Sequence, residues 1–227
     1  SCGWLVVTKS SAIQKISKKM TQLNDALVRE RYYYFLVAGI VIFLGIIPIL
    51  FQMPFPFMHD ESSLLHMGET FASGNITNPT HPMWKFFEAI HVFHEPTYTG
   101  KFPPVQALFL PLGFLIGHAI AGVLVSSIFA AVACTWALRS RFEIFWAGFG
   151  GVFYSIYFGF TNYFAQSYWG GSAAFGFGAL LIGSYLRLMD RYTVSNWITF
   201  ILSSFALGNT RPFELPCSAF LLCILVN

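Results

Sequence analysis

The chain has 227 residues, of which 56% are hydrophobic and only 10% are charged. Soluble domains carry about 25% charged residues, so this composition excludes an ordinary soluble protein and predicts an integral membrane protein. The net charge of +3 is too small to indicate a nucleic-acid-binding protein, and no motif for binding RNA or DNA is present. The aromatic content of 19% suits surfaces that face lipid and the membrane interface.

The N-terminal segment, residues 1–32, is basic. Residues 9–31 carry six Lys or Arg against two acidic residues. Apolar residues recur there at the spacing of one helical face, at Ile13, Ile16, Met20, Leu23 and Leu27. We therefore predict a basic amphipathic helix on the cytoplasmic leaflet, with a short helix docked on a partner domain or subunit as the alternative. Either arrangement predicts a cytoplasmic N-terminus.

Residues 33–227 are expected to form an all-α domain, a polytopic bundle of transmembrane helices. The first apolar run, 33–51, has 19 residues, which is long enough to cross a bilayer. Later runs follow at 119–138, 142–160, 171–189, about 192–208 and 212–226. Because the chain starts without Met and stops within or just after an apolar run, we expect it to be part of a longer protein, incomplete at its C-terminus.

The run 103–117 decides the predicted topology. It has about 15 residues and three prolines, fewer than the roughly 20 residues that a span needs. We therefore predict an interfacial or re-entrant helix here and an outer loop over residues 52–118. Four arginines then fall on the cytoplasmic side, as the positive-inside rule prefers: Arg139, Arg141, Arg187 and Arg191. The polar segments 52–102, 161–172 and 209–214 share the outer face.

The outer loop is expected to contain two interfacial helices. Residues 62–69 predict a short helix, with Asp60 as its N-cap and Gly74 closing it. Residues 83–94 predict a second helix, entered at Pro82 and lying along the membrane surface.

Asp60 and Glu61 form the only adjacent acidic pair in the chain. The structural interpretation of Asp60 is the N-cap just described. The functional interpretation, which is compatible with it, is a general base or a metal-linked carboxylate, with Glu61 tuning its proton affinity by like-charge repulsion.

Five of the six histidines also lie in the segment 52–102. His91 and His94 are one helical turn apart in the predicted helix 83–94, which makes them weak candidates for ligands of a divalent metal ion. No compact motif such as HExxH is present, and structural histidines at the membrane interface are the alternative.

Two cations stand beside prolines at the mouths of apolar segments: Lys101 before 102–104, and Arg211 before Pro212. Such residues can simply snorkel to the interface. Alternatively they bind a lipid phosphate, for which Arg offers a bidentate fork and Lys a point charge.

The segment 166–172 combines an amide, two aromatic residues and a Gly-Gly turn. This combination suits stacking on a sugar and hydrogen bonding to it, so we predict that Gln166, Tyr168 and Trp169 bind the sugar or its acceptor. An interfacial aromatic belt with a glycine turn is the alternative.

The order of these segments resembles membrane glycosyltransferases of the C-type fold that use polyprenyl-phosphate sugars, such as protein O-mannosyltransferases and lipid A aminoarabinose transferases. The resemblance covers roughly residues 33–226, the N-terminal half of such an enzyme. It implies that Asp60 is the catalytic carboxylate and that Lys101 and Arg211 contact the donor phosphate. Aminoarabinose transferases carry a second acidic residue in the outer turn, where this chain has Asn162 and Gln166.

The expected function is therefore inverting transfer of a sugar from a polyprenyl-phosphate donor to an acceptor hydroxyl on the outer or periplasmic face, with Asp60 as the base. The alternative is a polytopic transporter, in which intramembrane polar residues mark the substrate path, or a membrane-complex subunit without catalysis. The later apolar runs contain few ionisable residues, which favours the enzyme. A deep outer cavity that joins Asp60 to Arg211 would discriminate between enzyme and transporter.

Overall fold

The computed structural model of the protein describes residues 28–219. The predicted amphipathic helix, at 9–31, lies almost entirely outside the described residues, and so does the second half of the run 212–226. The described part is mostly helical, as the all-α prediction requires, but it also contains one antiparallel pair of short strands, β1 (Val92–Phe93) and β2 (Thr99–Gly100).

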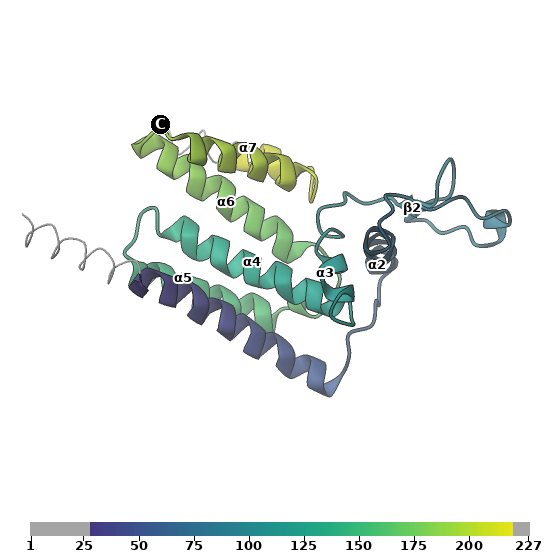
Figure 1. Ribbon diagram of the computed structural model, residues 1–227, viewed down its shortest axis with the longest axis horizontal. Helices are drawn as coiled ribbons and strands as arrows, with labels where there is room; N and C mark the ends of the chain where they lie inside the picture. Colours follow the sequence, from purple (N-terminus) through teal and green to yellow (C-terminus); the bar gives the residue numbers. More distant parts are fainter. Residues whose placement is uncertain (1–27, 220–227) are drawn as a thin grey trace, which may run out of the picture.

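Four of the described helices are long and apolar enough to cross a membrane: Val28–Phe51, α4 (Ile120–Leu138), Ile144–Thr161 and α6 (Gly171–Asp190). The third consists of α5 (Ile144–Ile156) and a π-helical turn over Tyr157–Thr161. A shorter apolar helix, α7 (Val194–Gly208), follows α6. Figure 1 shows these helices running side by side as a bundle. Each coincides with a predicted apolar run, since an unbroken apolar stretch of this length is stable across a bilayer only as a helix.

Helix α4 occupies the middle of the bundle and packs against α5 and α6. Its buried face is rich in small residues, among them Gly122, Ser126 and Ala130. Small residues let neighbouring helices approach closely, and hydroxyl groups can then bond across the contact. The hydroxyl oxygens of Ser127 on α4 and Ser172 on α6 are 3.1 Å apart, which ties the two helices together.

The run 103–117 does not cross the bundle. Its only helix, α3 (Leu110–Phe114), has five residues and contains Pro111 in its first turn. It lies against the start of α4, where a Cβ atom on Gly122 would collide with the carbonyl oxygen of Phe109. The glycine therefore allows α3 to fold back on the bundle. The prediction of a short helix in this run is confirmed, and its interfacial or re-entrant position stays a prediction.

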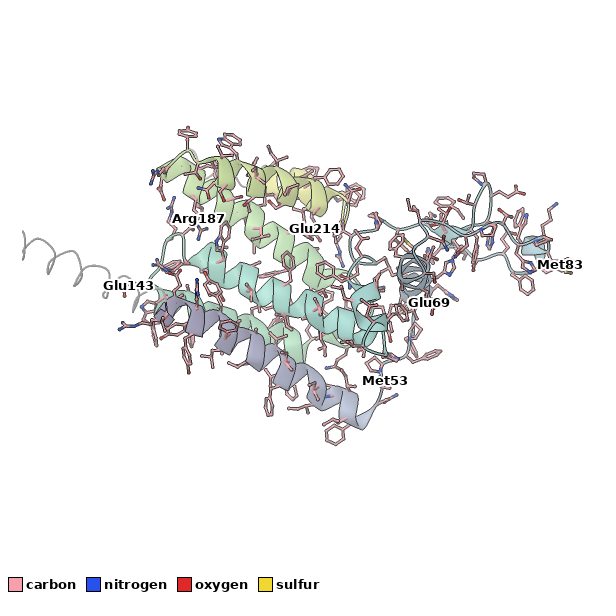
Figure 2. The ribbon with its side chains drawn as sticks, in the orientation of Figure 1. Met53, Glu69, Met83, Glu143, Arg187 and Glu214 are labelled. Atoms are coloured by element: carbon pink, nitrogen blue, oxygen red, sulfur yellow. The ribbon has the colours of Figure 1, made fainter. Side chains whose placement is uncertain are left out.

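One end of the bundle carries the arginines. Arg139 Nε lies 3.3 Å from Glu30 Oε1 on the first helix, and Arg141 pairs with Asp190 at the end of α6. Figure 2 places Arg187 at this same end. The predicted topology requires this arrangement, because the short run 103–117 leaves these residues on one side.

At the opposite end, α2 (His59–Ala72) lies beside α3. It is longer than the predicted helix 62–69 and ends, as expected, just before Gly74, whose φ is +79°. Its N-cap is Met58, which makes no side-chain capping bond, and Asp60 lies inside the first turn. The prediction that Asp60 is the N-cap is therefore wrong, because the helix begins earlier than the pattern indicated.

The predicted helix 83–94 is also wrong. The segment forms a single 3-10 turn, Trp84–Phe86, and then β1, which pairs with β2. Buried His94 lies between the rings of Trp84 and Tyr98, with centroids 5.5 and 5.4 Å away. This aromatic stack and the strand pairing outweigh the local helical pattern. Figures 1 and 2 show the segment extending away from the bundle, with Met83 near its tip.

Candidate functional site

A cavity of about 480 Å³ lies at the α2 end of the bundle. Four stretches far apart in the sequence line it: the first half of α2, residues 102–106, residues 169–170 and residues 210–214. Asp60 and Arg211 are both among the lining residues. The cavity therefore joins the two residues whose proximity the sequence analysis named as the discriminating observation.

Asp60 does not stand alone in this cavity. Its Oδ1 lies 3.0 Å from Nε2 of His91, so the two side chains form a carboxylate–imidazole pair. The His91 carbonyl accepts hydrogen bonds from the Ser63 hydroxyl (2.7 Å) and from the Lys101 N–H (3.0 Å). These bonds hold the residue that precedes β1 against α2. Because the contact with His91 is made by Oδ1, the second carboxylate oxygen of Asp60, Oδ2, lies outside this pair.

The close contact between the β-hairpin and α2 depends on Gly100. A Cβ atom at this position would lie 2.7 Å from the Ser63 hydroxyl and would collide with the Met67 sulfur. Glycine alone leaves room for the strand at this point. The pairing of His91 with Asp60 was missed in the sequence because the helix predicted over 83–94 points the imidazole elsewhere.

Glu61 has a different environment from its neighbour. It is buried, it does not line the cavity, and its Oε2 accepts a hydrogen bond from the Tyr168 N–H at 3.4 Å. Burial raises the pKa of the Glu61 carboxyl above its usual value; the Tyr168 N–H acts in the opposite direction, and the charge of Asp60 adds to the rise. Through this hydrogen bond, Glu61 connects α2 to the turn that contains Tyr168.

Tyr168 belongs to the same structural contact. Its side chain is buried, and its hydroxyl donates to the carbonyl of Pro54 at 3.2 Å. Burial, together with the charge of Glu61, raises the pKa of the Tyr168 phenol. Of the three residues predicted to bind a sugar, only Trp169 lines the cavity; Gln166 and Tyr168 do not.

The raised pKa of Glu61 makes a prediction about stability. The Glu61 carboxyl binds its proton more tightly in the folded state than in the unfolded chain. Protonated Glu61 therefore adds to the free energy of unfolding fully at low pH, and this contribution is lost as pH rises through the raised pKa. Glu61→Gln removes the titration and still accepts the Tyr168 hydrogen bond. We expect the melting temperature of this variant to rise relative to wild type as pH increases from the ordinary value of a glutamate carboxyl, 4.5, through the raised pKa of Glu61. Exposed Glu69→Gln is the control, and a pH-independent difference for Glu61→Gln would contradict the assignment.

Arg211 forms an ion pair with Glu214, three residues further along the same lining stretch. Arg211 Nη1 lies 3.4 Å from Glu214 Oε1, and both side chains are roughly two-fifths exposed. Lys101 is exposed and does not line the cavity, but its neighbours Phe102 and Pro103 do, so it stands beside the rim. One positively charged side chain, Arg211, therefore lines the cavity, and a second, Lys101, lies near its edge.

Gln106 is the lining residue that the sequence analysis missed. Its side chain is 2% exposed, and neither Oε1 nor Nε2 has a hydrogen-bond partner among residues 28–219. The sequence nevertheless contains a signal for this residue, because Gln106 is the single polar side chain of the run 103–117. A polar side chain in an otherwise apolar membrane segment is a functional candidate.

The structure offers little support for a metal at His91 and His94. The helical spacing that suggested the site is absent, since His94 belongs to the β-hairpin, where its Nε2 accepts from the Ala89 N–H at 3.2 Å. Residues 28–219 contain no group of three His, Cys, Asp or Glu side chains arranged to hold a metal ion.

A second cavity, of about 700 Å³, lies near the arginine end. The first helix contributes Glu30, Arg31 and Tyr34 to it, and α4 contributes Trp136. This cavity contains neither the acidic pair nor Arg211, so the two cavities are chemically distinct.

No protein-family model matches the chain, and the searches of curated proteins and of solved structures also gave no match. The function must therefore be argued from the residues of the site.

Proposed function

We propose that the protein is a membrane glycosyltransferase. It transfers a sugar from a polyprenyl-phosphate donor to an acceptor hydroxyl on the outer face of the membrane, with inversion at the anomeric carbon. The observation that carries this proposal is the cavity that Asp60 and Arg211 line together. Its apolar walls, which include Phe102, Trp169 and Phe213, suit an isoprenoid chain and the face of a sugar.

Asp60 is the proposed general base. With a proton on Nε2, His91 donates to Oδ1 of Asp60 and fixes the carboxylate, which leaves Oδ2 to accept the proton of the acceptor hydroxyl. The acceptor oxygen then bonds to the anomeric carbon while the bond from that carbon to the phosphate oxygen breaks. A single displacement of this kind inverts the configuration.

Arg211 is the proposed contact for the departing phosphate. The polyprenyl phosphate leaves with the electron pair of the broken bond, and a cation placed where that charge develops stabilises the transition state. Phosphate competes with Glu214 for the guanidinium, since Glu214 Oε1 lies 3.4 Å from Arg211 Nη1. Lys101 at the rim supplies a second positive charge for the donor as it enters from the membrane.

The proposed orientation places the cavity outside and the arginine end in the cytoplasm, in agreement with the positive-inside rule. A cysteine at Ser140, in the turn after α4, is expected to stay unlabelled by an impermeant maleimide in intact cells. A cysteine at exposed Asn75, just after α2, is expected to react. The four native cysteines, Cys2, Cys134, Cys217 and Cys223, are replaced beforehand. Labelling at Ser140 together with protection at Asn75 would reverse the orientation.

The experiment that tests the function is incubation of the full-length protein with a panel of polyprenyl-phosphate sugars and candidate acceptors. Acceptor-dependent release of polyprenyl phosphate is expected for at least one donor. A transporter would move such a molecule without breaking the bond between sugar and phosphate, so intact donor after transport would favour that alternative.

A further inference from the structure

Gln106 is a buried amide without a partner, and it faces the cavity. Its side chain packs beside Gly170, another lining residue: a Cβ atom built on Gly170 would be 3.1 Å from Gln106 Cβ and 3.5 Å from Thr210 Cγ2. The Thr210 hydroxyl already donates to the Ala206 carbonyl at 2.7 Å. The polar ends of Gln106 are therefore left for something inside the cavity.

Leaving such a group unpaired is costly. A buried polar atom without a hydrogen bond destabilises a protein by about 1–3 kcal/mol, and most buried polar groups have partners. Both ends of the Gln106 amide are unpaired. An apolar side chain of the same length would fill the same space without this cost, so the amide is explained best by a ligand.

The chemistry of the amide narrows the choice of ligand. Gln offers a carbonyl oxygen as acceptor and an NH₂ group as donor, side by side. A phosphate only accepts and an isoprenoid chain does neither, so neither satisfies both ends. Two neighbouring hydroxyl groups of a sugar do, because each hydroxyl can donate and accept. The indole of Trp169 lines the same cavity and offers an apolar face for the ring.

We propose that Gln106 binds a pair of neighbouring hydroxyl groups on the transferred sugar and thereby selects the donor. The inference rests on the proposed function. It adds that the donor carries a neutral sugar and that two adjacent hydroxyl groups of this sugar form hydrogen bonds with the Gln106 amide. Gln106 is a specificity-determining residue; proton transfer and phosphate binding belong to Asp60 and Arg211.

The test uses farnesyl phosphate esters of glucose, mannose and galactose with their monodeoxy analogues. Binding to the full-length protein is measured by calorimetry, and turnover by release of farnesyl phosphate. We expect wild type to bind one parent sugar best and to lose about tenfold in affinity for each of two adjacent hydroxyls removed, one for each neutral hydrogen bond.

Gln106→Met keeps the length of the side chain and removes its hydrogen bonds. Because both hydrogen bonds are lost, we expect it to bind the parent sugar about 100-fold more weakly than wild type does, and to lose nothing more when either of those hydroxyls is absent. Gln52→Met, the same change at an exposed position outside the cavity, should behave as wild type. The wild-type analogue series does not depend on the variant folding.

The outcomes separate the two proposals. Gln106→Met that discriminates between parent and deoxy sugars as wild type does would overturn the inference and leave a measured transferase activity intact. Binding that depends on Gln106 and on the hydroxyls, but without release of farnesyl phosphate, would support the inference and contradict the proposed reaction. Failure of wild type to bind any of these sugars would overturn the inference.

Discussion

The Asp60→Asn protein is expected to fold normally and to transfer sugar about 10²–10⁴-fold more slowly than wild type, the usual cost of losing a general base. Asn keeps the size of the side chain, and its carbonyl oxygen can still accept from His91, but it cannot take a proton from the acceptor hydroxyl. Rates of acceptor-dependent polyprenyl phosphate release, measured beside melting curves, check this expectation.

The structure removes the main competing explanation for such a loss. Met58 is the N-cap of α2, and Asp60 makes no capping bond, so the substitution does not remove a helix cap. Its effect on the helix dipole is small, about 0.3–1 kcal/mol. Glu69→Gln is the matched control, because it removes one negative charge from an exposed site on the same helix. A folded Asp60→Asn protein with the normal rate would rule out the catalytic assignment.

Arg211→Gln is expected to lower the turnover number by about 10²–10³-fold, which is typical when a group that stabilises transition-state charge is removed. Arg211→Lys should recover part of this loss, since lysine restores the charge but lacks the bidentate fork. The turnover number and KM for the donor, measured at saturating acceptor, distinguish a transition-state effect from weaker binding of the ground state.

Two further variants sharpen the assignment of Arg211. Glu214→Gln frees the guanidinium from its ion pair and should lower KM for the donor, because phosphate no longer competes with a carboxylate. Arg191→Gln removes an exposed arginine from the opposite end of the bundle and should have no effect. Normal turnover by Arg211→Gln would exclude a role in leaving-group stabilisation.

The membrane-spanning part of the fold could be predicted from the sequence because its signal is local. Apolar runs such as 119–138 and 171–189 lie within a few residues of α4 and α6. The short run 103–117 was also informative, since three prolines and a length of about 15 residues do not suit a span. From these elements alone, Asp60 and Arg211 could be expected at the same end.

The outer loop could not be predicted in the same way because its structure depends on distant partners. The β-hairpin forms where Gly100 meets α2, and His94 packs between two aromatic rings; neither contact leaves a periodic pattern in the sequence. The pairing of His91 with Asp60 followed from this hairpin and was missed with it. Gln106 did leave a sequence signal, a lone polar residue in an apolar run, but only burial shows that its amide lacks a partner.

The most direct measurement maps where the donor binds. A farnesyl phosphate sugar with a diazirine on its first isoprene unit is bound to the full-length protein and activated by light, and the adducts are located by mass spectrometry. The account predicts adducts on the apolar lining beside Arg211, at Phe102 and Phe213, that are suppressed by unlabelled donor. Adducts confined to the second cavity, at Tyr34 and Trp136, would contradict it.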